Sequence, residues 1–402
     1  MDFIITQTLA MMVVAIFVAI IARRLALPYT VGLVLAGIAL ALSRHDTGIR
    51  LTHDIIFNLI LPPLLFEAAI NIPWHELRRD MAPILALSVA GVVISAGLVS
   101  CGMVWLLGWP MEAAVIFGVL IAATDPVAVI AMFKDIGIQG RLRLLVESES
   151  LFNDGVAAVL FGLALSWAGG ESGSLLSGSR ALLTVSGGGI AVGLAVGGGA
   201  LLLAARTADH LVEAAVTCVA SYTAFIGAEY FHFSGVLATV SAGLLMGGVG
   251  VRGTAPALGL SKHGREFVIE FWEFLAFIAN SFVFLLIGAS LAQFSFRQVG
   301  VVTLSIAIVL VLLGRAATIY PLCAIFRNTS LTIGKAEQHV LWWGGLRGAL
   351  ALALALALPS SLPHREAVTI VTFGVVAFSV VVQGLTMPML LRKLNLLPKT
   401  PA

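Results

Sequence analysis

Four polar side chains open a long apolar stretch near the middle of the sequence. The segment "RLLVESESLFNDG" (residues 143–155) contains Glu149, Ser150, Asn153 and Asp154. In a helix, Ser150 and Asp154 are four residues apart and share one face, while Glu149 and Asn153 share the neighbouring face. Carboxylate, hydroxyl and amide oxygens are the ligands that small hard cations prefer. The segment therefore predicts a site for a small cation, with Asp154 as its central carboxylate.

A proline interrupts the apolar segment that precedes this one. In "ATDPVAV" (residues 123–129), Pro126 lacks a backbone donor and disfavours helix at Asp125. The break frees backbone carbonyl oxygens, notably that of Thr124, which could bind the same cation. Two roles stay open for Asp125. It could stabilise the positive ends of the half-helices, or it could contact the ion directly.

Glycines loosen a late apolar segment in the same way. The sequence "WGGLRGAL" (residues 343–350) places three glycines around Arg347, and glycine is a poor helix former. We expect Arg347 either to offset the negative ends of half-helices or to pair with Glu149. Paired interruptions in equivalent helices are the sequence sign of a binding site near the membrane midplane.

We expect structural roles for the other charged residues in or near the predicted membrane spans. A structural hydrogen bond is expected for Glu67, which follows "LPPLLF", with a contribution to the ion site as the alternative. Arg315 is expected to be structural, and Glu147 to form a surface pair with Arg143, four residues before it. Four carboxylates near the predicted ends of helices are expected to face water or lipid headgroups: Glu213, Glu229, Glu270 and Glu273.

The composition requires a membrane environment for these segments. The 402 residues are 59% hydrophobic and 11% charged, with a mean hydropathy of +1.05, whereas soluble domains carry roughly 25% charged residues. Uninterrupted apolar runs indicate helices rather than a barrel. The lipid bilayer is thus a partner, and no basic tract suggests nucleic acid. No phosphate-binding G-x-x-x-x-G-K-[ST] loop occurs, which leaves ATP-driven transport unsupported, and no H-E-x-x-H or G-x-S-x-G motif occurs, which argues against a membrane protease or hydrolase. We therefore expect a transporter and not an enzyme.

The fold class predicted is an all-α polytopic membrane protein with about thirteen transmembrane helices. The predicted spans are 3–22, 28–43, 52–70, 82–108, 111–132, 144–168, 180–205, 209–229, 234–250, 268–292, 298–326, 337–358 and 365–391. With the N-terminus outside, 16 of the 23 lysines and arginines fall in inner loops and five in outer loops, as the positive-inside rule requires. Six spans, a seventh and six more allow two inverted repeats, each with one discontinuous helix.

The combination of motifs resembles a known transporter family. "ATDPVAV", "ESLFNDG", "GGLRGA" and "LPPLLFE" together are similar to the sodium/proton exchangers of the cation/proton antiporter superfamily, and most similar to their NhaP-like electroneutral branch. The resemblance implies that Asp154 is the ion- and proton-binding aspartate and that Asn153 stands where electrogenic relatives have a second aspartate. It also implies a structural ion pair of Glu149 with Arg347, and positions near the cation for Ser150 and Thr124.

The same resemblance implies an assembly and a division into domains. A homodimer is expected, with its dimerisation domain formed by residues 1–80 and, together with a linking helix, residues 171–296. The core ion-transport domain would comprise residues 81–170 and 297–402. The chain would lie in the cell (inner) membrane, with its N-terminus outside and its C-terminus in the cytoplasm.

The function predicted is secondary active antiport that serves pH homeostasis. Na⁺, with Li⁺ as a second candidate, would exchange for H⁺ in an electroneutral 1:1 ratio, because cation and proton would compete for Asp154. The transported Na⁺ would be bound by Asp154, Ser150 and Thr124, and no cofactor is expected. The alternatives are a K⁺/H⁺ antiporter with the same site and a cation channel.

Overall fold

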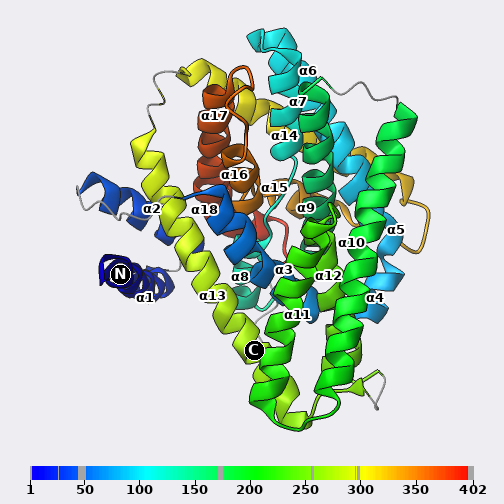
Figure 1. The fold of residues 1–402 in the computed structure, drawn as a ribbon. Helices are drawn as coiled ribbons and strands as arrows, with labels where there is room; N and C mark the ends of the chain where they lie inside the picture. The colour runs from blue at the N-terminus through cyan, green and yellow to red at the C-terminus, as the bar shows by residue number, and fades with distance from the viewer. Residues whose placement is uncertain are drawn as a thin grey trace. The chain divides into compact units, whose positions relative to one another are not determined.

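The computed structural model describes residues 2–25, 27–43, 51–170, 175–254, 258–294, 296 and 299–396 (Figure 1). Helices joined by short connections make up these ranges, which contain no β-strand. Four segments, labelled η, are π-helical turns within longer helices. The elements are α1 (Asp2–Leu25), α2 (Tyr29–Leu42), η1 (Ile55–Ile60), α3 (Leu61–Asn71), α4 (Trp74–Arg79), α5 (Met81–Leu85), η2 (Ala86–Ala90), α6 (Gly91–Leu107), α7 (Met111–Leu120), α8 (Val127–Ile136), α9 (Arg141–Ala168), α10 (Leu175–Ala204), α11 (His210–Tyr230), α12 (Gly235–Leu245), η3 (Met246–Val251), α13 (Lys262–Gln293), α14 (Val301–Ile325), α15 (Lys335–Trp343), α16 (Ala349–Leu356), α17 (Arg365–Phe378), η5 (Ser379–Gln383) and α18 (Gly384–Lys393).

Every predicted span corresponds to helix in the described residues. Among these residues, seven helices are long and apolar enough to cross a bilayer, and five shorter apolar helices add to them. The pair α15 and α16 forms the remaining one of the thirteen. The fold is therefore an all-α polytopic membrane protein in which two six-span halves flank α10.

One span in each half is discontinuous, as the proline and the glycines predict. The fifth span ends as helix at Leu120 and resumes at Val127, and the twelfth ends at Trp343 and resumes at Ala349. These two interruptions are called the first break and the second break below. The four half-helices α7, α8, α15 and α16 thereby place helix ends inside the membrane-spanning part of the chain.

Contacts group the chain into two compact units. One contains residues 1–53, 82–153 and 281–402, and the other contains residues 54–81 and 154–280, so the boundaries fall within α9 after Asn153 and within α13 before Ser281. Both breaks belong to the first unit. Within that unit, α6 packs against α7 and α14, and α17 packs against α14 and α16. The predicted dimerisation and transport domains stay a prediction, because contacts within one chain do not identify a dimer surface.

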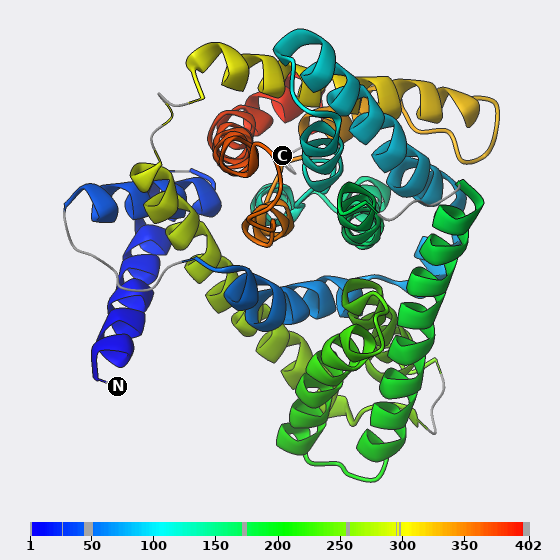
Figure 2. The same ribbon diagram turned by 45° about the horizontal axis from the view of Figure 1, so that its top comes forward.

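Small residues allow the helices of the second unit to approach closely. Helix α12 packs against α10, α11 and α3 (Figure 2, α10–α12 in green to yellow-green and α3 in blue). A Cβ added at Gly189 of α10 would lie 2.5 Å from the Ser234 carbonyl oxygen, and one at Gly197 would lie 3.1 Å from Ala242. Because these glycines stand on one face of α10, the stretch "SGGGIAVGLAVGGG" (residues 186–199) is a helix-packing surface.

Two charged side chains of the second unit are bound at helix ends. Arg252 donates to the carbonyl oxygens of Ile70, at 3.1 Å, and of Asn71 at the C-terminal end of α3, where a cation is favourable. Burial lowers the pKa of the Arg252 guanidinium. Glu213 is 0% exposed and accepts hydrogen bonds from the Ser261 backbone and hydroxyl, each at 2.8 Å. The expectation that Glu213 faces water was therefore wrong, whereas Glu229, Glu270 and Glu273 are exposed as predicted.

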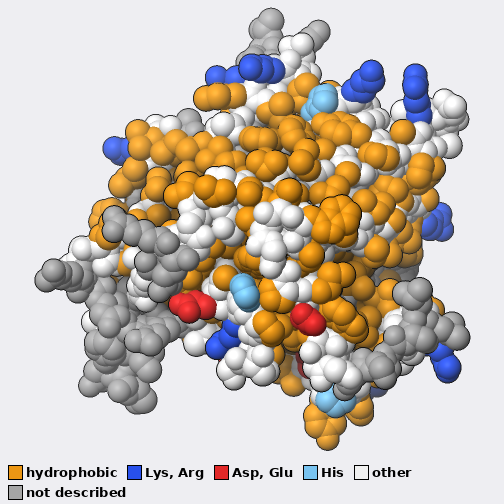
Figure 3. Space-filling view, turned by 90° about the horizontal axis from the view of Figure 1, so that it is seen from above, with side chains coloured by type: hydrophobic (Ala, Val, Ile, Leu, Met, Phe, Trp, Pro, Cys, Tyr) orange, Lys and Arg blue, Asp and Glu red, His pale blue; other side chains and the backbone are white. Residues whose placement is uncertain are grey.

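The surface of the chain suits a lipid environment. Large apolar side chains in the middle of long helices are exposed, among them Leu183 at 72% and Val219 at 65%. The face in Figure 3 is largely hydrophobic, with basic side chains mostly at its margins and a few charged ones in its lower part. Soluble monomers rarely expose apolar areas of this extent, so these helix faces suit contact with lipid or with another apolar protein surface.

Candidate ion-binding site at the two broken spans

The two breaks lie side by side and satisfy part of each other's backbone. Asp125 N, in the first break, donates to Leu346 O in the second at 2.7 Å. The Asp125 carboxylate accepts from Val127 N at 2.9 Å and from the backbone of Ala349, the first residue of α16. Asp125 therefore caps the N-terminal ends of α8 and α16 together. This is the structural role that the sequence left open, and an acidic group at helix N-termini is stabilising.

A glycine makes this double cap possible. A Cβ added at Gly348 would overlap the Asp125 carboxyl group, so only glycine fits between the carboxylate and the start of α16. Gly348, which was expected only to weaken the helix, thus has a packing role as well. Gly345 has a similar one, because a Cβ there would lie 2.6 Å from Arg315 Nε.

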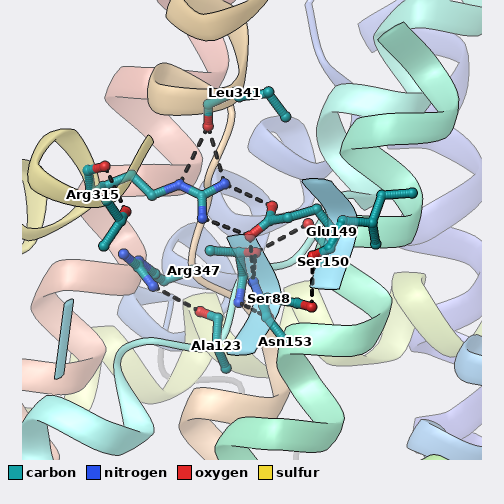
Figure 4. Close-up of polar contacts among 11 residues, drawn as sticks. Ser88, Ala123, Glu149, Ser150, Asn153, Arg315, Leu341 and Arg347 are labelled. Carbon is teal, nitrogen blue, oxygen red and sulfur yellow. Dashed lines mark hydrogen bonds and ion pairs between the residues drawn. The ribbon is translucent and has the colours of Figure 1, made fainter. Parts of the chain in front are cut away.

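Glu149 forms its ion pair with Arg315 and not with Arg347, which corrects the pairing implied by the sequence. Arg315 of α14 donates from Nη1 to Oε1 and from Nη2 to Oε2 of Glu149, each at 2.7 Å. Glu149 is 1% exposed and Arg315 6%. Arg315 Nη2 also donates to Leu341 O of α15 at 3.1 Å (Figure 4). The bidentate pair thus ties α9, α14 and the C-terminal end of α15 together.

Arg347 serves the first break instead. Its Nη1 donates to Ala123 O at 3.1 Å, just beyond the C-terminal end of α7 (Figure 4). Arg347 is 2% exposed. Of the two roles predicted for Arg347, the structure supports the one at a half-helix C-terminus, where the dipole favours a cation.

Polar side chains of α9 hold the first break on its other side. Asn153 Oδ1 accepts from Thr124 N at 3.0 Å, and Asn153 Nδ2 donates to Thr124 Oγ1 and to Glu149 Oε1. Thr124 Oγ1 donates to Ser150 Oγ at 3.0 Å. The three residues are buried. The structure thus brings together Thr124, Ser150, Asn153 and Glu149, which the sequence placed at the cation site from spacing and resemblance.

The other predicted residues fall into three places. Asp154 is the next residue of α9 after Asn153, and its Oδ1 atom is buried. Glu67 belongs to the second unit, where it accepts a hydrogen bond from Asn71 Nδ2 at 3.0 Å, which agrees with the structural hydrogen bond expected for it. Glu147 pairs with Arg143 at 3.5 Å, but it is 8% exposed and therefore buried rather than on the surface.

Comparison with known proteins identifies the family. The family model described as "Sodium/hydrogen exchanger, transmembrane" matches residues 12–393. The chain belongs to this family. Its members are transporters and not enzymes, so the resemblance read from the motifs is confirmed.

Relatives of the exchanger are similar along most of its length. The Na(+)/H(+) antiporter ApNhaP of Aphanothece halophytica is 39% identical over 373 residues, which cover 92% of this chain and 70% of the relative. The Na(+)/H(+) antiporter NhaH of Halobacillus dabanensis is 32% identical, with 97% and 98% covered. The solved structure of the sodium proton antiporter MjNhaP1 from Methanocaldococcus jannaschii matches with a TM-score of 0.71 at 21% identity, covering 97% and 98%. The predicted antiporter fold is therefore confirmed.

Replacing Gly348 by alanine is expected to destabilise the exchanger. The new methyl group would overlap the Asp125 carboxyl group, and overpacking of this kind costs about 1–3 kcal/mol. We expect a lower melting temperature in detergent and a smaller folded yield by size-exclusion chromatography. Gly97→Ala is the matched control, because a Cβ there has no atom within 4 Å. Equal melting temperatures for the two variants would contradict the packing role of Gly348.

Proposed function

We propose that the chain is a secondary antiporter that exchanges Na⁺, with Li⁺ as a further substrate, for H⁺. The observation that carries the proposal is the meeting of two broken spans beside the hydroxyl and amide groups of α9, in a chain of the exchanger family. Relatives that are 39% and 38% identical bear the name Na(+)/H(+) antiporter. Sequence relatives of this similarity, which cover more than 90% of the chain, support the same exchange here.

Asp154 is the proposed site of competition between the cation and the proton. The charged side chains described around the breaks are Asp125, Glu149, Arg315 and Arg347, so two carboxylates offset two guanidinium groups. Asp154 follows directly on α9 and adds one negative charge when it is ionised. A proton or a monovalent cation on this carboxylate restores neutrality, and an uncompensated charge in a span costs about 2.5–3.5 kcal/mol.

The proposed cation ligands are oxygens from α9 and the first break. Asp154 and Ser150 lie one helical turn apart on α9, and the Ser150 hydroxyl is hydrogen-bonded to that of Thr124. Bound Na⁺ would replace this hydrogen bond by contacts with both oxygens, since hard cations prefer oxygen ligands. Glu149, Asn153, Asp125 and Arg347 would shape the site.

Electroneutral exchange follows from this arrangement of charge. Glu149 is neutralised by Arg315, and Asn153 carries no charge. The site would therefore cross the membrane in the same charge state with Na⁺ as with H⁺. If only the loaded states can change sides, one Na⁺ is exchanged for one H⁺ by alternating access.

The setting proposed is a homodimer in the cell (inner) membrane, with the N-terminus outside and the C-terminus in the cytoplasm. The distribution of lysine and arginine among the loops supports this orientation. Residues 1–80 and 171–296 would form the dimerisation domain and linking helix, and residues 81–170 and 297–402 the transport core. Neither cofactor nor nucleic acid has a role in the proposal, and the exchange would serve pH homeostasis.

Proteoliposomes with an entrapped pH dye test the function. Adding Na⁺ to acid-loaded vesicles should raise the internal pH, and Li⁺ should do so as well. Clamping the membrane potential with a potassium ionophore should leave the Na⁺ rate unchanged, because a 1:1 exchange moves no net charge. A response to K⁺ but not to Na⁺ would indicate the K⁺/H⁺ antiporter instead, and a rate that follows the potential would contradict 1:1 exchange.

A further inference from the structure

Three polar side chains of the last span hold the second break. Ser379 Oγ accepts from Arg347 N at 3.0 Å, and Gln383 Nε2 donates to Trp343 O at 3.0 Å. Thr386 Oγ1 accepts from Trp343 Nε1 at 2.9 Å. Ser379 and Gln383 are 1% and 3% exposed. The three residues follow one another at intervals of four and three, and therefore share one face of the span.

The bonded backbone groups are those that a broken helix leaves without partners. Trp343 is the last residue of α15, so its carbonyl oxygen has no acceptor role within that helix. Arg347 N lies in the non-helical stretch before α16. In a bilayer each unsatisfied backbone group costs several kcal/mol. Ser379 and Gln383 thus satisfy one group at each end of the break and fix its position.

A π-helical turn provides the two side chains that reach the break. Ser379 and Gln383 are the first and last residues of η5. Such turns are rare, interrupt α-helices locally and occur frequently at functional sites. Here the turn lies in the part of the last span that bonds the second break, and both of its terminal side chains form hydrogen bonds with backbone groups of the break.

The two halves of the chain repeat this arrangement. The last span is the thirteenth and α9 is the sixth, so they occupy equivalent places in the two six-span halves. In α9 a hydroxyl and an amide, Ser150 and Asn153, hold Thr124 of the first break. In the last span a hydroxyl and an amide, Ser379 and Gln383, also hold a break, although they bond backbone groups of two residues, Arg347 N and Trp343 O.

We propose that Ser379 and Gln383 are positioning residues of the exchange reaction, with Thr386 as an outer support. Ser379 holds Arg347 at one end of the second break, and Gln383 holds Trp343 at the other. Because Arg347 Nη1 donates to Ala123 O beside Thr124, the position of the second break sets the geometry of the first, where the cation would bind. The inference rests on the proposed function, since its readout is the apparent affinity for Na⁺. The inference gives the second six-span half a role in shaping the ion site, although the proposed ion ligands are residues of the first half.

The test compares the Na⁺ dependence of exchange for single variants in proteoliposomes. Ser379→Ala and Gln383→Leu should each raise the apparent KM for Na⁺ about tenfold while keeping most of the maximal rate, because a mispositioned break weakens cation binding. Thr386→Val should raise KM about threefold, since Thr386 is partly exposed and its bond to the second break comes from the Trp343 side chain, while its other bonds are to Val382 O and Gln383 O of its own helix. This third variant keeps the test informative if the two buried substitutions lower the folded yield.

Thr372→Val is the matched control for loss of a buried hydroxyl. Thr372 lies on α17 of the same span, is 0% exposed and donates only to Val368 O of its own helix. Its KM should stay within twofold of that of the unmodified protein. Unchanged KM values for Ser379→Ala, Gln383→Leu and Thr386→Val, or an equal rise for Thr372→Val, would overturn the positioning role. Absence of exchange in the unmodified protein would instead refute the proposed function.

Discussion

Asp154→Asn is expected to lower Na⁺/H⁺ exchange by about a hundredfold or more, because a neutral amide neither takes up and releases a proton nor neutralises a cation. The substitution keeps the size and hydrogen-bonding shape of the side chain. The variant should therefore fold and remain monodisperse in detergent. The measurement is Na⁺-driven dye dequenching in proteoliposomes at equal protein density.

Glu147→Gln is the control for this prediction. Glu147 is also a buried carboxylate of α9, and its partner is Arg143, in the preceding helical turn. Its amide variant should retain most of the exchange rate. Exchange by Asp154→Asn at the rate of the unmodified protein would rule out Asp154 as the competing carboxylate.

Arg315→Ala is expected to destabilise the fold by about 3–5 kcal/mol, the usual cost of leaving one partner of a buried ion pair unpaired. The Glu149 carboxylate would lose both of its 2.7 Å hydrogen bonds from the guanidinium group, and Leu341 O would lose its donor. We expect a large fall in folded yield and in melting temperature, measured on protein purified in detergent.

A second substitution tests which arginine pairs with Glu149. Adding Glu149→Gln to Arg315→Ala removes the stranded charge and should recover much of the lost stability. The same addition to Arg347→Ala should recover nothing, because Arg347 donates to Ala123 O and not to Glu149. Rescue of Arg347→Ala but not of Arg315→Ala would restore the pairing that the sequence implied.

The spans and their interruptions were predictable because they depend on local physics. Apolar length identifies a membrane span, Pro126 prevents a continuous helix, and consecutive glycines weaken one. Helical spacing also placed Ser150 and Asn153 on adjacent faces of α9, towards the first break. These features need no knowledge of which helices become neighbours.

The partner of Glu149 was not predictable on the same basis. Two arginines, Arg315 and Arg347, lie in late spans at large sequence separation from Glu149. Either could compensate the carboxylate, and spacing cannot say which helix packs beside α9. The packing of α14 against α15 decides the choice, since Arg315 reaches Leu341 O and Glu149 from the same position.

Burial near span ends also escaped prediction, as Glu213 shows. Its position at the start of a span suggested water, but Ser261, 48 residues later in the chain, binds its carboxylate. The last span held a weaker signal that could have been read. In "FSVVVQG" (residues 378–384), Ser379 and Gln383 are two polar residues four apart within an apolar run, the same pattern that drew attention to α9.

Proton release on Na⁺ binding tests the central claim most directly. Na⁺ is added to purified protein in unbuffered detergent solution at a pH where Asp154 is protonated, and the pH is recorded alongside Na⁺ binding. Competition for one carboxylate predicts about one proton released for each Na⁺ bound, and no release from Asp154→Asn. Binding of Na⁺ without proton release, or equal release from Asp154→Asn, would contradict the account.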